Sequence, residues 1–257
     1  MKSKSDKIKE QNRYNQFSQN KLSSISEAQL KTIGAKNFPP YLQSPYIFYE
    51  ELLKNHVNSK TKVMDLCCGG GIHSISLGYL SDQVIAMDIA ENSIELSKLR
   101  AKILKVNTIQ FLKGDAEDIQ FPDNSFDVVT CVGSISYVEL EKFTAEVLRI
   151  LKPGGRFIAL DSFNHNPIYR FNRYIHYLKG NRSISTLNRM PTEKTLAYLK
   201  GQFQSLEKHY FGIFTFIAPL FSSFLGETKA KKVIDYLDKK VSFLKKYSFK
   251  IVIFAIK

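Results

Sequence analysis

The chain has 257 residues and 44% of them are hydrophobic, so it is long enough to bury the core of a globular α/β domain. Its net charge of +13 is uneven: residues 163–257 carry 17 basic and 5 acidic groups, whereas residues 61–162 are acidic overall. Such a basic region can attract nucleic acid, anionic lipid or an anionic substrate, or it can simply be a solvated face.

Export and membrane insertion are not expected. The first 18 residues are polar and charged, unlike a signal peptide, and the apolar stretch 211–225 is shorter than the ~20 residues that a spanning helix needs. The three cysteines, Cys67, Cys68 and Cys131, form no CxxC pair. We therefore expect core thiols in a cytoplasmic protein, with no disulfide framework and no metal site.

The N-terminal part, residues 1–57, predicts a helical cap. Residues 1–20 are expected to be frayed, and residues 21–57 to form short helices that Pro39, Pro40 and Pro45 interrupt. An amphipathic helix is expected over residues 46–53. It could form a lid over the glycine turn that follows, or it could simply cover the sheet.

Apolar strands then alternate with helices. Strands are expected at residues 63–66, 84–88, 109–112, 126–132 and 156–160, and two more at 209–216 and 249–256. This alternation predicts a Rossmann-like, doubly wound α/β fold, with a mostly parallel seven-stranded sheet and helices on both faces. The domain is expected to cover residues 58–257, with a helical insertion at 161–190 after the fifth strand.

A glycine-rich turn follows the first strand. Gly69, Gly70 and Gly71 let the backbone approach a ligand where a Cβ would clash, and the helix that starts there favours an anionic group. Acidic residues also fall at the ends of the strands: Asp65, Asp88, Asp115 and Asp161. Sheets of this kind bind ligands beyond the carboxyl ends of their strands, so these residues predict a site at one edge.

The residues of this turn allow two interpretations. Gly69, Gly71 and Ser74 nearly fit the dinucleotide fingerprint, with Asp88 near the expected ribose-binding position, so a nicotinamide-dependent dehydrogenase is one alternative. Asp65 within the first strand and the sequence at 114–116 point elsewhere. Together, the stretches 63–71, 84–88, 114–119, 121–129 and 151–155 resemble the class I S-adenosylmethionine-dependent methyltransferases, in particular the small-molecule and quinone-type branch.

The resemblance implies that the cofactor is S-adenosyl-L-methionine, and it implies a role for each matching residue. The methionine part of the cofactor would lie in the turn, against Cys67, Gly69 and Gly71, with its ammonium group near Asp65. The ribose and adenine would be bound by Asp88, Ile89, Asp115 and Ala116, and the region near the sulfonium would be lined by Val132 and Gly133. The family usually has glycine at position 67, so we expect the Cys67 backbone to avoid positive φ.

The implied reaction is in-line transfer of a methyl group to a small-molecule or lipid-like acceptor. An oxygen or carbon nucleophile would need a base, for which His165 and Tyr137 are the candidates. The basic C-terminal region allows two other hypotheses about partners, peripheral contact with an anionic membrane and RNA methylation. The motif of the exocyclic-amine nucleic-acid methyltransferases is missing after the fourth strand, so nucleic acid is the less favoured partner. A non-catalytic cofactor-binding protein is a third alternative.

Overall fold

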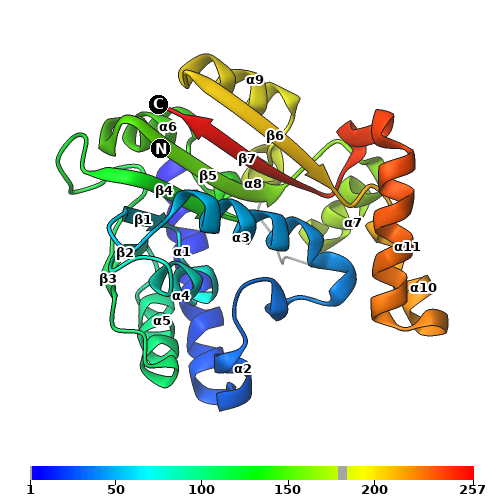
Figure 1. Cartoon of the computed structure of the whole chain (residues 1–257), viewed down its shortest axis with the longest axis horizontal. Coiled ribbons are helices and arrows are strands. Elements are labelled where there is room, and N and C mark those ends of the chain that lie inside the picture. Colours follow the sequence, from blue (N-terminus) through cyan, green and yellow to red (C-terminus); the bar gives the residue numbers. More distant parts are fainter. Residues whose placement is uncertain (1, 179–183) are drawn as a thin grey trace.

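The computed structural model describes residues 2–178 and 184–257, and over these ranges its strands form one seven-stranded sheet (Figure 1). The strand order is β3-β2-β1-β4-β5-β7-β6. The strands are β1 (Lys62–Leu66), β2 (Gln83–Asp88), β3 (Ile109–Lys113), β4 (Phe126–Val132), β5 (Leu151–Ser162), β6 (Ser205–Phe211) and β7 (Lys250–Ile256). The mostly parallel, doubly wound sheet is thus confirmed, with the qualification that β7 runs antiparallel to both β5 and β6.

The strand order reverses at β1. The chain moves outward from β1 to β2 and β3, and then returns to place β4 on the other side of β1. At such a reversal the connections leave the sheet in opposite directions, so a crevice opens beyond the carboxyl ends of β1 and β4. The glycine turn follows β1 directly and therefore lies at this crevice.

The sixth strand begins and ends earlier than the sequence predicts. It covers Ser205–Phe211, and the residues that follow turn away at Gly212, whose φ is +78°. The Asp238 carboxylate accepts the backbone N–H groups of Gly212, Ile213 and Phe214. Since a side chain satisfies these donors, the apolar residues after Phe211 need no neighbouring strand.

Helices cover both faces of the sheet. One face is packed by α3 (Ser44–His56), α4 (Ile72–Gly78) and α5 (Glu91–Leu104), and the other by α6 (Leu140–Ile150) and α9 (Glu193–Gln202). Tyr49 and Leu53 of α3 are fully buried against β5 and β7. Of the two roles considered for residues 46–53, α3 therefore takes the second and covers the sheet.

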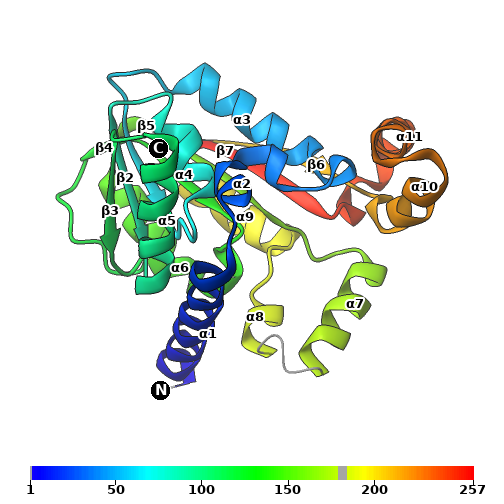
Figure 2. The same ribbon diagram turned by 90° about the horizontal axis from the view of Figure 1, so that it is seen from below.

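The N-terminal residues are helical, so the expectation of a frayed end at 1–20 was wrong for residues 2–20. Helix α1 (Lys2–Ser24) is polar and lies along α5, as Figures 1 and 2 show. It is held by side-chain hydrogen bonds: Asn15 bonds Asn92, and the Ser18 hydroxyl lies 2.9 Å from that of Ser93. Short elements then lead to α3, namely α2 (Glu27–Lys31), η1 (Gly34–Asn37) and η2 (Pro40–Leu42).

Several helices gather at the end of the molecule opposite β3 and α5 (Figures 1 and 2). They are α7 (Pro167–Leu178), α10 (Ala218–Leu225) and α11 (Glu227–Lys240). The short helix η4 (Thr215–Ile217) precedes α10, and η5 (Ser242–Tyr247) follows α11. The predicted insertion after the fifth strand corresponds to α7 and α8 (Ile184–Asn188), and its residues 179–183 lie outside the described ranges. None of the helices in these ranges combines the length and the apolar character needed to cross a bilayer.

Candidate functional site

The glycine turn departs from ordinary backbone geometry at three positions. Gly69 and Gly71 have φ values of +53° and +75°. A Cβ built on Gly71 would lie 3.2 Å from the Cα of Ser97, a tighter contact than backbone atoms normally allow. A Cβ on Gly69 would meet no atom within 4 Å, because this residue borders open space. Glycine is thus required for close packing at position 71 and leaves room for a ligand at position 69.

Cys67 contradicts the expectation that it avoids positive φ. Its φ is +56°, in the left-handed region, which costs a non-glycine residue roughly 1–2 kcal/mol. The turn is fixed from both sides, because the Cys68 N–H donates to the Met87 carbonyl of β2 and the Gly71 N–H to the Cys68 carbonyl. These hydrogen bonds over-determine the path of the chain, so the cysteine must follow the conformation that glycine usually supplies.

Two side chains of α5 hold the outer side of the turn. The Ser97 hydroxyl donates to the Gly69 carbonyl at 2.7 Å, and the Arg100 Nε donates to the Gly70 carbonyl at 2.8 Å. Arg100 is only 2% exposed, and its Nη1 also donates to the carbonyls of Leu30 and Thr32. Arg100 therefore links the turn to the segment after α2. Sequence reasoning missed this role, since a single arginine within an amphipathic helix gives no signal.

Asp65 lies beneath the turn and is 2% exposed. Its two carboxylate oxygens accept hydrogen bonds from the Ser74 hydroxyl of α4 at 2.6 Å and from the Thr130 hydroxyl of β4 at 2.8 Å. Burial raises the pKa of Asp65 to about 6, and the two hydroxyl groups oppose that rise. The carboxylate ties β1 to both neighbouring elements.

Asp88 ends β2 and faces the turn. One carboxylate oxygen accepts the Gly69 N–H at 2.9 Å, and the other accepts the Ala90 N–H at 2.8 Å. Burial raises the pKa of Asp88, while the backbone N–H groups counteract this rise. Each oxygen keeps a free lone pair, so the carboxylate can still accept hydrogen bonds from a ligand.

Asp115 follows β3 and is held by the N-terminal helix. Lys7 of α1 lies 2.7 Å from the carboxylates of both Asp115 and Glu117. Burial alone would lower the pKa of Lys7, but the hydrogen bonds and charges of the two acids raise it. The second oxygen of Asp115 accepts the Glu117 N–H at 2.9 Å. Helix α1 is thus fastened to the residues that the resemblance assigns to adenine.

Further contacts hold α1 over the crevice, so that this helix forms the roof, that is, the outer wall, of the site. Gln11 donates to the Ile89 carbonyl at 3.0 Å, and the Tyr14 ring meets the Tyr137 ring edge-on with centroids 5.5 Å apart. Burial, together with the neighbouring Tyr137, raises the pKa of Tyr14 well above its ordinary value. The sequence did not predict this roof, because α1 has no apolar stripe to mark a packed face.

A cavity of about 230 Å³ lies between the roof and the strand ends. Among the residues that the resemblance singles out, those lining it are Cys67, Gly69, Asp88, Ile89, Asp115, Ala116, Val132, Gly133 and Tyr137. Asp65 lies below the turn and Gly71 packs on Ser97, so these two support the cavity wall from behind. The structure therefore brings the turn, the ends of β2, β3 and β4, and Tyr137 to one place.

His73 also lines this cavity. Its ring is stacked parallel to Tyr46, with centroids 5.6 Å apart, and meets Tyr49 edge-on. Burial, with a contribution from the Lys250 charge, lowers the pKa of His73 to about 4, so the ring is neutral at pH 7. Its buried Nδ1 has no hydrogen-bond partner in the part of the chain that the structure describes.

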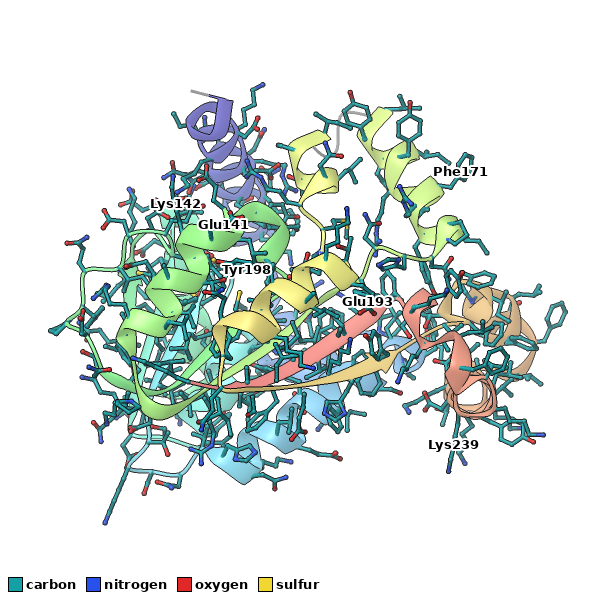
Figure 3. All side chains as sticks on the ribbon, turned by 90° about the horizontal axis from the view of Figure 1, so that it is seen from above. Glu141, Lys142, Phe171, Glu193, Tyr198 and Lys239 are labelled. Carbon is teal, nitrogen blue, oxygen red and sulfur yellow. The ribbon has the colours of Figure 1, made fainter. Side chains whose placement is uncertain are left out.

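His165 lies elsewhere. It lines a separate cavity between α7, α8 and α9, and its Nε2 accepts the Glu193 N–H at 3.0 Å. Glu193 begins α9, as Figure 3 shows, so His165 satisfies one of the free backbone donors at that helix start. The ring nitrogen that would act as a base is already occupied, whereas Tyr137 faces the cavity under α1.

A doubly wound sheet with a glycine turn and with acids at the ends of neighbouring strands defines a nucleotide-binding α/β fold of the methyltransferase type. Comparison with known proteins agrees with this class. Residues 64–159 match the family described as "Methyltransferase domain", and this part contains the glycine turn, Asp88 and Asp115.

Curated relatives cover part of this chain. It is 39% identical over 114 residues to a demethylmenaquinone methyltransferase of Leptospira interrogans, which covers 42% of this chain and 46% of the relative. It is 31% identical over 129 residues to the protein of the same name from Listeria welshimeri, covering 48% and 55%. The chain thus spans about half the length of the curated relatives it matches.

Solved structures share the fold. Phosphoethanolamine N-methyltransferase 2 of Haemonchus contortus, in complex with S-adenosyl-L-methionine, has a TM-score of 0.59 at 16% identity, covering 82% of this chain and 52% of that one. The YcgJ protein of Bacillus subtilis has a TM-score of 0.55 at 20% identity, covering 82% and 98%. At these identities the likeness establishes the fold alone.

Proposed function

We propose that the chain binds S-adenosyl-L-methionine under α1 and transfers its methyl group to a small-molecule acceptor by in-line displacement. The observation that carries the proposal is the cavity itself. It combines a glycine turn with open space at Gly69 and two carboxylates, those of Asp88 and Asp115, at the ends of adjacent strands. Within residues 2–178 and 184–257, no group of three or more His, Cys, Asp and Glu side chains is arranged to hold a metal ion.

The donor set suits an adenosyl compound. Asp88 keeps acceptor capacity for ribose hydroxyls, and Ile89 offers an apolar surface to a base. Asp115 would accept the adenine amino group, with the Ala116 N–H directed at a ring nitrogen. The orphaned Nδ1 of His73 provides a further polar atom at the cavity wall. Asp65 would act from below the turn, through the negative charge that it places near the methionine ammonium group.

The protein's main task in such a transfer is alignment and exclusion of water. The bound cofactor supplies an activated methyl group, which carries the chemical driving force. Holding two reactants in line can contribute roughly 7–11 kcal/mol. Helix α1 closes the cavity from above through Lys7, Gln11 and Tyr14. Tyr137, which lines the cavity, is the candidate for receiving a proton from an oxygen or carbon nucleophile.

We infer that the acceptor is apolar and quinone-like. The two curated relatives described above are both named demethylmenaquinone methyltransferase. Apart from the residues of α1, the lining of the pocket lies within residues 64–159, which match the methyltransferase domain family. The walls beside the turn include the apolar side chains of Met87, Val132 and Val138. The aromatic residues of α7, by contrast, do not line this cavity: Tyr169 is buried and Phe171 is 66% exposed.

Calorimetry with the cofactor and with its demethylated product tests the binding step. Replacing Asp88 by Ala removes two charge-assisted hydrogen bonds to the ribose, worth about 3 kcal/mol together, so the affinity should fall roughly 100-fold. Asp82→Ala is the matched control, since Asp82 is exposed and precedes β2 at the opposite edge of the sheet. If neither compound bound, or if both variants bound alike, the proposal would fail.

A second experiment tests transfer and the base. Purified protein, labelled cofactor and a reduced, short-chain demethylnaphthoquinone should give labelled product. Tyr137→Phe should lower the rate at saturating substrate, while His165→Gln should leave it within a factor of a few, because His165 lies in another cavity. A large effect of His165→Gln with none of Tyr137→Phe would reverse the assignment of the base.

We further propose that the protein contacts an anionic membrane through the end formed by α7, α10 and η5. Large apolar side chains are exposed there: Phe171, Leu178, Leu220, Phe224 and Phe243. Figure 3 shows Phe171 directed away from the body of the protein, and Lys239 of α11 also points outward. Lysines beside exposed apolar groups favour an interface with anionic lipid.

Flotation with phosphatidylglycerol vesicles tests this contact. The double variant Leu220→Ser with Phe224→Ser should float several-fold less than the parent protein, because it removes two apolar anchors. Tyr79→Ser is the control, since Tyr79 is 58% exposed but follows α4 at the other end of the molecule. Equal flotation of all three proteins, or equal binding to uncharged phosphatidylcholine vesicles, would count against the membrane surface.

A further inference from the structure

A second cavity, of about 540 Å³, lies away from the glycine turn. Its walls come from η2 and the start of α3, from the end of β6, and from α11 and η5. These segments are far apart in the sequence, and all but η2 and α3 follow residue 200. The cavity belongs to the basic part of the chain, and the proposed methyl transfer gives it no role.

The side chains around this cavity carry more positive than negative charge. The lysines that line it are Lys208, Lys239, Lys245 and Lys250, whereas the acids are Asp235 and Asp238. Both acids are already engaged. Asp238 accepts three backbone N–H groups at the end of β6, and Asp235 accepts the Ser44 hydroxyl and pairs with Lys231. Asp235 is thus paired with a lysine that does not line the cavity, and Asp238 is held by backbone N–H groups at the end of β6.

The positive charges of the lysines are compensated less than the negative charges of the two acids. Within the described ranges, neither Lys239 nor Lys245 forms an ion pair. Lys245 and Lys208 approach the same aromatic ring, with their Nζ atoms 6.0 and 5.8 Å from the centroid of Tyr210. Lys208 also pairs with Glu193 at 3.0 Å. The arrangement leaves an aromatic surface between two cations at the wall of the cavity.

One polar side chain at this cavity is buried without a hydrogen-bond partner. The Ser248 hydroxyl, on a residue that is 1% exposed, has no hydrogen bond within the part of the chain that the structure describes. His209, whose side chain is 35% exposed, also lines the cavity, and its Nε2 lies 3.6 Å from the Glu207 carboxylate. Buried polar groups in folded proteins are nearly always satisfied, so the unpartnered Ser248 hydroxyl at the cavity indicates a missing ligand.

We propose that this second cavity binds the phosphate group of a small phosphorylated organic molecule. Phosphate oxygens accept hydrogen bonds from lysine ammonium groups, from a serine hydroxyl and from an imidazole N–H, which are the donors present here. Phe211, Pro45 and the ring of Tyr210 provide an apolar surface for the organic part. The inference goes beyond methyl transfer, and phosphate binding can be measured without it.

Calorimetry of the full chain at constant ionic strength tests the proposal, with inorganic phosphate and phenyl phosphate as probes. Lys245→Ala and Ser248→Ala should each weaken binding of phenyl phosphate at least tenfold. Lys246→Ala is the matched control, because Lys246 is the next residue of η5, is also exposed and does not line the cavity. Circular dichroism establishes that each variant is folded.

Each outcome decides the question. Selective loss in Lys245→Ala and Ser248→Ala supports the site, and tighter binding of phenyl phosphate than of phosphate identifies the ligand as an organic phosphate. If the two probes bind with equal affinity and show the same selective loss, the cavity binds an anion, and the proposal that it recognises an organic group is wrong. Binding that is equally weak in all variants, or equally reduced by Lys246→Ala, means an adventitious ion only and overturns the proposal. Ser248→Ala should also raise the melting temperature of the free protein, since it removes an unsatisfied hydroxyl.

Discussion

Replacing Asp65 by Asn should make the protein more stable at neutral pH. In the folded protein the pKa of Asp65 is raised from its ordinary 3.8 to about 6, chiefly by burial. The unfolded chain therefore releases the Asp65 proton first as the pH rises, and the folded state holds it until about pH 6. Stability is thus highest below pH 4, falls between about pH 4 and 6, and stays reduced above that interval.

The size of this loss of stability follows from the difference of about 2 pKa units between folded and unfolded Asp65. At 1.36 kcal/mol per unit, ionised Asp65 lowers the free energy of unfolding at pH 7 by roughly 3 kcal/mol. Asparagine has nearly the same shape and cannot ionise. The Ser74 and Thr130 hydroxyls, which now donate to the carboxylate, can rotate so that one of them accepts from the new amide. Asp65→Asn should therefore gain up to ~3 kcal/mol at pH 7 and almost nothing at pH 4.

Urea unfolding at several pH values between 4 and 8 measures this difference. The chain contains no tryptophan, so far-UV circular dichroism is the suitable probe. Burial also raises the pKa values of Asp88 and Asp161, which add to the pH dependence of the parent protein, so the informative quantity is the difference between parent and variant. Equal pH dependence of the two proteins would refute the reasoning. If Asp65 serves the cofactor, the stabilised variant should also bind S-adenosyl-L-methionine more weakly.

Three further predictions use matched variants. Gly71→Ala should destabilise the protein more than Gly69→Ala in urea unfolding, because both share the left-handed φ but only Gly71 meets backbone at 3.2 Å; equal losses would contradict this. Lys7→Met should speed chymotryptic cleavage within α1 several-fold, whereas Lys9→Met, at an exposed position, should not; an unchanged rate would show that the ion pairs do not hold the roof. Arg100→Met should cost about 3 kcal/mol in the same unfolding assay, since it leaves buried carbonyls unpaired, and a loss below ~1 kcal/mol would refute this.

The parallel core could be predicted because its signals are local. Short apolar runs such as 63–66 and 84–88 became β1 and β2. Burial on both sides of a parallel sheet produces such runs, and each ends where a turn residue or an acid begins. The sixth strand was displaced because Asp238, which lies 26 residues after Gly212, satisfies the backbone there. A long-range side-chain contact of this kind has no signature in the local sequence.

The residues of the candidate site also differ in whether the local sequence could predict them. Residues in the turn and at strand ends could be predicted, because their positions follow from topology. The roof could not, since α1 is held by polar contacts such as that of Lys7 with Asp115 rather than by an apolar stripe. The prediction that the Cys67 backbone avoids positive φ was wrong for a related reason. Propensity disfavours φ of +56° for cysteine, but the hydrogen bonds around the turn leave the chain no other path.

The position of β7 in the sheet constrains the order in which the strands can pair during synthesis. This strand is the last of the seven along the chain, yet it lies between β5 and β6 and pairs with both. During synthesis, β1 to β4 can assemble early, while β5 and β6 keep open edges until residue 256 has left the ribosome. Apolar residues such as Ile251 and Ile253, which are fully buried at the end, close those edges in one step. A nascent chain halted before residue 250 would therefore expose strand edges that invite aggregation and chaperone binding.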